Sequence, residues 1–188
     1  MSKIKAEYKK KLRAGWLLMQ LDEASFNPKS QKMSSWAPST KPLSAQYRWT
    51  PGKYVTSMAA ISVDHGLEQV RFMQGGGFKK PDFIEFLKDL QLKYPERKIL
   101  IFVDNCGIHK LGTVASYLED CKKDLKLLYN APYRPDLMGV ELYWREAKSH
   151  YRKAVVNRVA TWSPIDNISM VREALDRIPT KNTIEFAE

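Results

Sequence analysis

Three acidic residues have the type and the sequence surroundings expected of a shared metal site. Asp22 and Asp104 each end a largely apolar run, over residues 16–22 and 99–104, that is typical of a buried strand. Glu141 opens a segment rich in charged and aromatic residues that predicts a helix. Carboxylates are costly to bury, and a bound cation explains such a placement. Their oxygens suit Mg²⁺ or Mn²⁺, and two such ions can hold the attacking and leaving oxygens of a phosphodiester. This chemistry is that of a nuclease or a strand transferase.

The strands and helices that must position these residues can be predicted from the hydrophobic pattern. We expect strands over 16–22, 54–63, 67–73, 99–103 and 125–129, and helices over 81–94, 110–121, 140–156 and 168–178. A proline-spaced stretch over 27–53 predicts a long surface loop, and 160–188 a helical extension. Three antiparallel strands followed by alternating helices and strands predict an α/β fold. It is a ribonuclease H-like mixed five-stranded sheet with helices on both faces, in one domain over 1–188. In this order the first and fourth strands are neighbours, so Asp22 and Asp104 should converge.

Composition narrows the class of protein. The 188 residues include 44% hydrophobic and 28% charged residues, and no apolar run is long enough to cross a membrane. The basic first residues lack a following apolar segment, so a secretory signal is not expected. Cys106 and Cys121 are too few for a disulfide framework or a structural zinc site. The net charge of +10 favours a polyanionic partner such as nucleic acid, although a basic surface without a partner would give the same total.

Several short motifs resemble a known family of enzymes. They are Leu21 to Phe26, Ser35 to Pro38, Val103 to Asn105 with His109, Pro132 to Leu137, and Glu141 with Trp144 and Lys148. In this order they resemble the catalytic domain of Asp-Asp-Glu transposases of the mariner-like superfamily and its bacterial insertion-sequence relatives. The resemblance covers roughly residues 16–150. It implies that Asp22, Asp104 and Glu141 are catalytic ligands of two Mg²⁺ or Mn²⁺ ions, with Asp22 bridging both.

The sequence departs from the family pattern in three respects. Asp104 and Glu141 are 37 residues apart, slightly more than the common family spacing. Met138-Gly139-Val140 stands where relatives usually carry Asn-Pro-Ile, and a glycine fixes a helix start less firmly than a proline. Relatives also carry helix-turn-helix DNA-reading domains before the catalytic domain, so we expect this chain to be a catalytic half.

Neighbours of the acids have both functional and structural interpretations. Glu23 should face the opposite side of its strand from Asp22, which suggests a structural role. Asn105 and His109 could contact DNA or a water molecule on the metal, or could belong to a loop or helix start. Cys106 is interpreted as a packed thiol, because no activating His-Asp pair is recognisable near it.

Candidate DNA contacts lie on the predicted long loop and on the helix after Glu141. Trp36, like Trp49 and Tyr54, could stack on bases or could pack in the core. Arg145, Lys148 and Arg152 recur at helical spacing and form a basic stripe, which is either a phosphate-binding surface or a solvated helix face. We predict Arg145, Lys148, Arg152, Trp36 and His109 as DNA contacts.

The function predicted is metal-dependent cleavage and joining of DNA. One strand is hydrolysed, and the freed 3′-hydroxyl attacks target DNA. The alternatives are a catalytically weakened or domesticated DNA-binding or assembly subunit, and another ribonuclease H-like nuclease. The expected partners are DNA, a second copy in a homodimer, and a separate helix-turn-helix chain, with no membrane. The expected location is the cytoplasm of a bacterium or the nucleus of a eukaryote.

Overall fold

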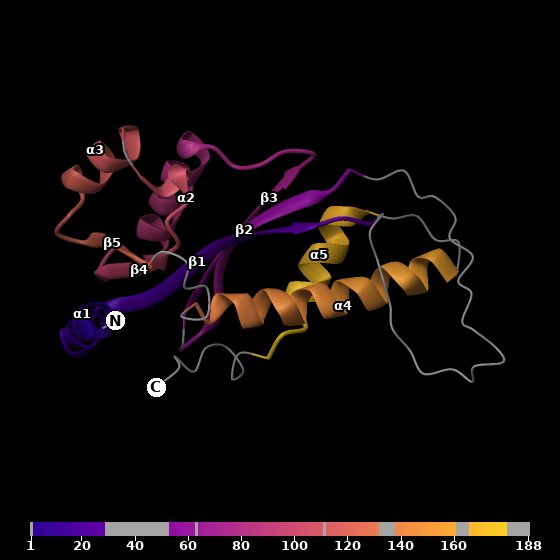
Figure 1. Ribbon diagram of the computed structural model, residues 1–188, viewed down its shortest axis with the longest axis horizontal. Helices are drawn as coiled ribbons and strands as arrows, with labels where there is room; N and C mark the ends of the chain where they lie inside the picture. Colours follow the sequence, from indigo (N-terminus) through magenta and orange to yellow (C-terminus); the bar gives the residue numbers. More distant parts are fainter. Residues whose placement is uncertain are drawn as a thin grey trace.

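The computed structural model describes residues 2–28, 53–62, 64–110, 112–131, 138–160 and 166–179. Figure 1 labels the helices and strands. The strands form one sheet, and the helices lie around it. In chain order the elements are α1 (Ser2–Arg13), β1 (Leu17–Phe26), β2 (Val55–Ser62), β3 (Gly66–Gln74), α2 (Lys80–Lys93), β4 (Ile99–Val103), the 3-10 turn η1 (Gly107–His109), α3 (Thr113–Asp120), β5 (Leu125–Tyr129), α4 (Val140–Ala160) and α5 (Asn167–Asp176).

The five strands form one mixed sheet in the order β3-β2-β1-β4-β5. β1, β2 and β3 are antiparallel neighbours, whereas β4 and β5 run parallel to β1. The parallel pairs need crossover connections, which α2 and α3 supply. This is the mixed five-stranded sheet predicted from the sequence, with β1 and β4 side by side.

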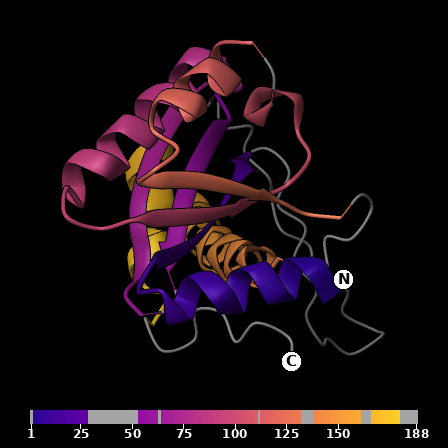
Figure 2. The same ribbon diagram turned by 90° about the vertical axis from the view of Figure 1, so that its left-hand side faces the viewer.

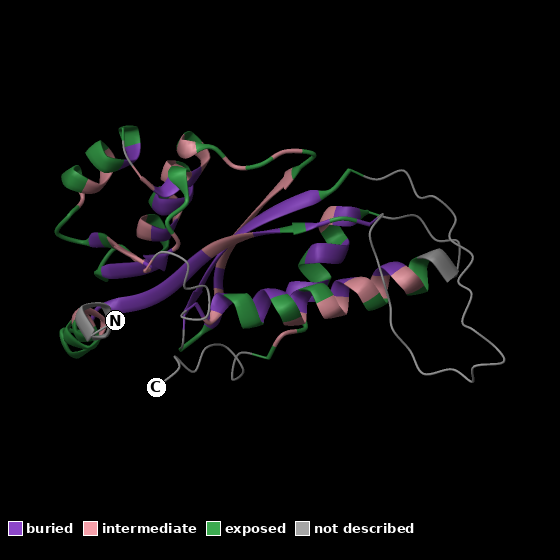
Figure 3. Cartoon of the chain, in the orientation of Figure 1, coloured by how far each residue is buried: buried purple, intermediate pink, exposed green. Residues whose placement is uncertain are grey.

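The two faces of the sheet are covered by different helices, as the views in Figures 1 and 2 show. Because side chains alternate along a strand, Leu17, Met19 and Leu21 pack on one face with α2, while Ala24 and Phe26 pack on the other with α4 and α5. The buried strands lie between these layers (Figure 3). Neighbouring residues of β1 therefore pack against helices on opposite faces of the sheet.

Helix α1 is an element that the sequence patterns did not predict. It contributes Tyr8 to a small apolar cluster with Trp16, Leu18 and Leu100. The ammonium of Lys11 lies 4.1 Å from the centre of the Trp16 ring. Its basic last turn suits the negative end of the helix dipole, and packing on the sheet stabilises a helix that is otherwise highly charged. No described helix is both long and apolar enough to span a membrane.

The element boundaries differ from the predictions at two places that matter for the site. β1 continues to Phe26 because β2 pairs with it along its length, as far as the pair of Phe26 with Val55. The predicted helix over 110–121 is shorter: η1 comes first, and α3 begins only after Gly112, whose φ of +61° lies in the left-handed region. Most of the predicted loop over 27–53, and much of 160–188, lie outside the described residues.

Candidate active site

Asp22 and Asp104 are brought together by the register of two parallel strands. The last pair of that register joins Leu21 of β1 to Val103 of β4, and the two aspartates are the next residue on each chain. The prediction placed Asp22 at the end of its strand. It lies instead in the middle of β1, at the point where the parallel partner β4 stops. Because β4 ends at Val103, the pairing of β1 with β4 stops directly before Asp22.

The carboxylate of Asp22 lies in an environment that disfavours its negative charge. Its pKa is raised from 3.8 to about 7. Burial is the largest cause, the charges of Glu23, Glu141 and Asp104 add to it, and a backbone hydrogen bond at Glu23 acts in the opposite direction. Four acidic side chains from three segments thus interact electrostatically. A cation among them would offset both the burial and the repulsion.

Two hydrogen bonds fix helix α4 against β1. Oε1 of Gln20 accepts a hydrogen bond from the backbone N–H of Val140, at 2.8 Å, and Oδ2 of Asp22 accepts one from the indole N–H of Trp144, at 3.1 Å. Gln20 and Asp22 share one face of the strand, and Val140 and Trp144 share one face of the helix. These bonds set the position of the first turn of α4, which carries Glu141.

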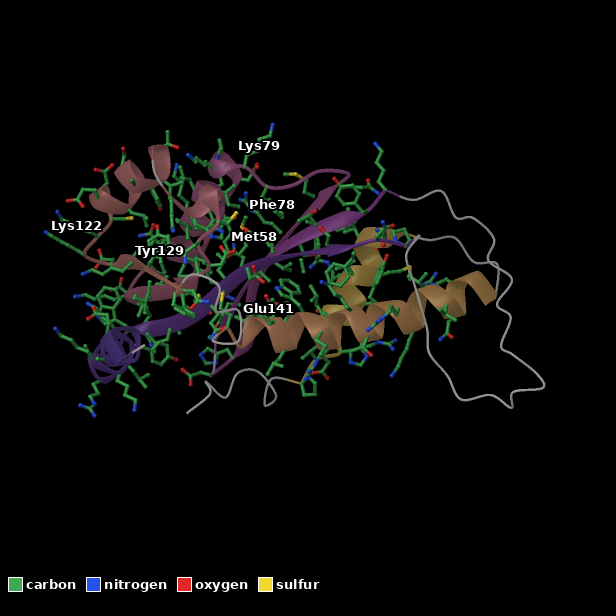
Figure 4. The ribbon with its side chains drawn as sticks, in the orientation of Figure 1. Met58, Phe78, Lys79, Lys122, Tyr129 and Glu141 are labelled. Carbon is green, nitrogen blue, oxygen red and sulfur yellow. The ribbon has the colours of Figure 1, made fainter. Side chains whose placement is uncertain are left out.

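Glu141 is exposed on the first turn of α4, where Figure 4 labels it. The segment Met138-Gly139-Val140, which replaces the usual family residues, is anchored by its two apolar side chains: Met138 is 4% exposed and Val140 is fully buried. The backbone N–H of Glu141 donates to the carbonyl of Met138 at 3.1 Å, which closes the first turn. Burial and the Gln20 hydrogen bond hold this helix start without proline.

A groove of about 430 Å³ extends from Glu141 along α4. All three residues of the predicted basic stripe, Arg145, Lys148 and Arg152, line it together with Glu141, and the end of β1 forms another part of its lining. The groove therefore joins an acidic end to a basic wall, as expected where a phosphate backbone approaches a metal site.

The loop after β4 is held by its own hydrogen bonds. Oδ1 of Asp104 accepts from the backbone N–H of Cys106 at 2.8 Å, and Nδ2 of Asn105 donates to the carbonyl of Asn130 at 2.5 Å. The ammonium of Lys110 also donates to Oδ1 of Asn105. Asn105 therefore has the loop role that was one of its two interpretations. The prediction that Cys106 is packed is wrong, because the residue is exposed.

His109 is completely buried, so its prediction as a direct DNA contact is corrected. The imidazole Nε2 lies 3.1 Å from Oε1 of Glu23, and Nδ1 lies 2.9 Å from Oδ1 of Asp104. The second contact is close but not aligned as a hydrogen bond, since Nδ1 has no partner of hydrogen-bond geometry. Burial lowers the pKa of His109, but the hydrogen bond and charge of Glu23, with the charge of Asp104, outweigh it and raise the pKa above its ordinary value. Glu23 faces away from α4, as predicted.

The donor set fits a hard divalent cation in its chemistry but is not closed around one point. Asp22, Asp104 and Glu141 offer carboxylate oxygens, the ligands that Mg²⁺ and Mn²⁺ prefer. Within the described ranges, no three His, Cys, Asp or Glu side chains are grouped closely enough to hold a metal ion. Mutual repulsion among carboxylates keeps such side chains apart when no cation is present.

The positioning roles of two site residues were not predicted from the sequence, although Trp144 belongs to the motifs that resemble the family, and two other candidates lie outside the described residues. Gln20 and Trp144 position α4, and a polar residue inside the apolar run of β1 was the available sign for Gln20. Trp36 and Trp49 lie outside the described residues, and Tyr54 is 40% exposed.

Comparison with known proteins identifies the family. A family described as DDE superfamily endonuclease matches residues 18–161. The chain belongs to this family. The prediction of a member of the Asp-Asp-Glu (DDE) superfamily is thereby confirmed.

Solved structures of Mos1 transposase share the fold. The Mos1 strand transfer complex has a TM-score of 0.63 at 16% identity, covering 97% of this chain and 54% of that one. The Mos1 paired-end complex with the left transposon end has a TM-score of 0.63 at 18% identity, covering 97% and 55%. The Mos1 catalytic domain with Raltegravir and Mg has a TM-score of 0.64 at 16% identity, covering 97% and 81%. The chain thus spans about half the length of the first two. The sequence matches no curated protein.

Proposed function

We propose that this chain cleaves and joins DNA strands, using two Mg²⁺ or Mn²⁺ ions held by Asp22, Asp104 and Glu141. The observation that carries the proposal is the register of β1 with β4, which makes Asp22 and Asp104 the residues that directly follow the last paired positions. Support comes from the family, whose members are endonucleases, and from Mos1 catalytic-domain structures described with Mg and with Mn.

Each acid has a distinct task in this proposal. Asp22 interacts electrostatically with both others, so it would bridge the two ions, with Asp104 completing one and Glu141 the other. When bound, the ions would stabilise negative charge on the attacking and leaving oxygens of the phosphodiester. The protein holds Glu141 in register through Gln20 and Trp144, so that the third ligand arrives on a rigid helix.

DNA would lie along the groove beside α4. Arg145 and Lys148 are exposed, and with Arg152 they line the groove that starts at Glu141. Cationic side chains in this arrangement bind phosphates without reading sequence. We therefore propose backbone binding here, and the same proposal extends to Trp36 as a stacking residue.

Assembly and location belong to the same proposal. We propose that the chain acts as a homodimer on paired DNA ends, with sequence recognition by a helix-turn-helix unit, in a bacterial cytoplasm or a eukaryotic nucleus. The Mos1 relatives include a paired-end complex with a transposon end.

The test is nicking of supercoiled plasmid by the purified chain with Mn²⁺. Wild type should nick, Asp104→Ala should lose at least about 100-fold in rate, and Asp120→Ala, which removes an exposed aspartate at the end of α3, should retain full activity. DNA binding by wild type without any nicking would instead favour a non-catalytic DNA-binding subunit. Equal nicking by wild type and Asp104→Ala would refute the assigned site.

A further inference from the structure

The imidazole of His109 lies between carboxylates from two segments of the chain. Nε2 is 3.1 Å from Oε1 of Glu23 on β1, and Nδ1 is 2.9 Å from Oδ1 of Asp104 after β4. The ring is fully buried, whereas the side chain of Asp104 is 44% exposed and that of Glu23 is 18% exposed. A buried ring therefore connects two carboxylates that are partly accessible to solvent.

The ring has little freedom to move. The backbone N–H of His109 donates to the carbonyl of Cys106 at 3.1 Å, and its carbonyl accepts from the hydroxyl of Tyr129 at 2.7 Å. Tyr129 stands at the end of β5 (Figure 4). The imidazole also packs on Phe83 of α2, with ring centroids 4.7 Å apart. The main chain, the β5 hydroxyl and an aromatic ring of α2 thus fix the histidine independently of the acids.

Both described contacts of Asp104 fall on the same oxygen. Oδ1 meets the N–H of Cys106 and the Nδ1 of His109, and no hydrogen bond to Oδ2 occurs in the described ranges. A half-exposed carboxylate that follows a strand end would otherwise rotate. With Oδ1 held on one side, Oδ2 is the oxygen left for a cation.

We propose that His109 is a positioning residue for the metal site, and that Glu23 acts through it. The bridge from Glu23 through His109 to Asp104 fixes the carboxylate of Asp104 and ties the loop after β4 to the part of β1 that carries Asp22. This inference rests on the proposed function, because it takes Asp104 as a metal ligand. The contact of Nδ1 with Asp104 is a close ion pair, and removal of the outer partners that orient a metal ligand typically changes metal affinity or activity by about 10- to 100-fold.

A purely structural histidine is the alternative. A buried imidazole that packs on Phe83 and spans two segments would stabilise the fold whether or not it orients Asp104. Such a role predicts lower stability on substitution but unchanged metal affinity in the molecules that remain folded. Metal affinity therefore separates the two roles, and thermal unfolding monitors the fold.

The experiment measures binding of Mn²⁺ alone to the full chain, by electron paramagnetic resonance of the free ion, at a temperature where each variant is folded. His109→Ala and Glu23→Ala should each weaken Mn²⁺ binding by about 10- to 100-fold. His109→Gln, whose amide can reach one of the two carboxylates, should restore part of the affinity. In a double-mutant cycle, the effects of Glu23→Ala and His109→Ala should be clearly less than additive, because Glu23 acts through the ring in addition to its own charge near Asp22.

Tyr117→Phe is the matched control, because it removes a hydroxyl of α3 that donates to Gln91 of α2 and leaves both imidazole contacts in place. It should lower the unfolding temperature while changing Mn²⁺ affinity less than about threefold. If His109→Ala does not fold, Glu23→Ala decides, since its side chain is partly exposed and its removal should be tolerated. Wild-type Mn²⁺ affinity in folded Glu23→Ala and His109→Ala would overturn the positioning role.

Asp104→Asn separates failure of this inference from failure of the proposed function. Loss of Mn²⁺ binding in Asp104→Asn, with no effect of the His109 and Glu23 substitutions, would overturn only the positioning role. Wild-type Mn²⁺ binding in Asp104→Asn would overturn the assignment of Asp104 as a ligand, and with it both proposals.

Discussion

The two faces of the sheet are held by different kinds of contact. On the α2 face the centre of the interface is apolar, with Phe86, Leu87 and Leu90 fully buried against the sheet. On the α4 face buried hydrogen bonds accompany the apolar contacts, including those from Val140 to Gln20 and from Trp144 to Asp22. Apolar packing is non-directional, whereas a buried hydrogen bond is satisfied in one register only. Buried hydrogen bonds therefore fix the register of the helix that carries Glu141.

The polar contacts of α2 support this contrast, because they lie at its edge. Arg71 of β3 forms ion pairs with Glu85 and Asp89, and Lys93 forms one with Glu68. Most of these side chains are substantially exposed. Such pairs add little free energy and leave the interior of that face to packing. The contacts of α2 with the sheet are therefore mainly supporting, whereas those of α4 set the position of Glu141.

The largest expected effect comes from replacing the central acid of the α4 face. Asp22→Asn should reduce Mn²⁺-dependent nicking by about 100- to 1,000-fold, because it removes a charged ligand while its amide oxygen can still accept from Trp144. Plasmid nicking at saturating Mn²⁺ measures this, with Asp120→Asn as the control. Activity near that of the control would remove Asp22 from the site.

On the α2 face a large decrease in stability should leave the chemistry intact. Leu90→Ala removes a fully buried side chain and should lower the free energy of unfolding by about 2–5 kcal/mol. Urea denaturation measures the decrease, and nicking per folded molecule should stay at the wild-type rate. A parallel fall in activity of the folded protein would show that α2 also helps to position the site.

Asp22 should also make stability depend on pH in the metal-free protein. Its pKa is about 7 in the folded state against 3.8 ordinarily, so between these values the folded chain binds the proton that the unfolded chain releases. The free energy of unfolding should therefore fall as pH rises from about 4 to about 7, and Asp22 should add no further slope above that. Urea denaturation in the presence of EDTA, repeated from about pH 4 to about pH 8, measures this dependence of the free energy of unfolding on pH. In Asp22→Asn this part of the slope should vanish, and the variant should be more stable than wild type at pH 8.

A substitution at Gln20 can remove the hydrogen bond that fixes α4 while keeping the volume of the side chain. Gln20→Met keeps the size of the side chain but leaves the N–H of Val140 without its acceptor, which should cost about 1–3 kcal/mol of stability. Nicking should fall as well, because the first turn carrying Glu141 is no longer fixed. Measured stability and nicking should change together here, unlike in Leu90→Ala. An unchanged nicking rate in folded Gln20→Met would mean that packing alone positions Glu141.

The smallest effect is expected at the groove. Alanine at Arg145, Lys148 and Arg152 should make the slope of log affinity against log salt shallower by about 0.9 for each phosphate of duplex DNA that is no longer neutralised, with Mn²⁺ binding unchanged. The matched control, alanine at the exposed Lys88, Lys122 and Lys123, removes the same charge elsewhere and should leave the slope close to that of wild type. Equal changes in both triple variants would mean that the groove has no special role.

Local sequence patterns predicted much of the fold. The strands over 99–103 and 125–129 were predicted with their observed bounds, and most helices within a few residues. Periodicity works at this level because each element buries one face, so its own residues carry the pattern. The pattern did not predict α1, whose charged sequence becomes a helix beside Trp16 and the sheet. It also missed the final residues of β1, which remain a strand because β2 pairs with them.

The amino-acid sequence was sufficient to predict the family and the order of the strands, and the assignment of three acids as metal ligands stays a prediction. Which groups orient these acids depends on how the elements pack. Val140 and Gln20 are 120 residues apart, Trp144 and Asp22 are 122 apart, and His109 and Glu23 are 86 apart. Contacts at such separations follow from strand register and helix position, which local periodicity does not encode. The same local pattern left His109 open to either a DNA contact or a loop role, and the packing of η1 between β1 and α2 buried it beside Glu23 and Asp104.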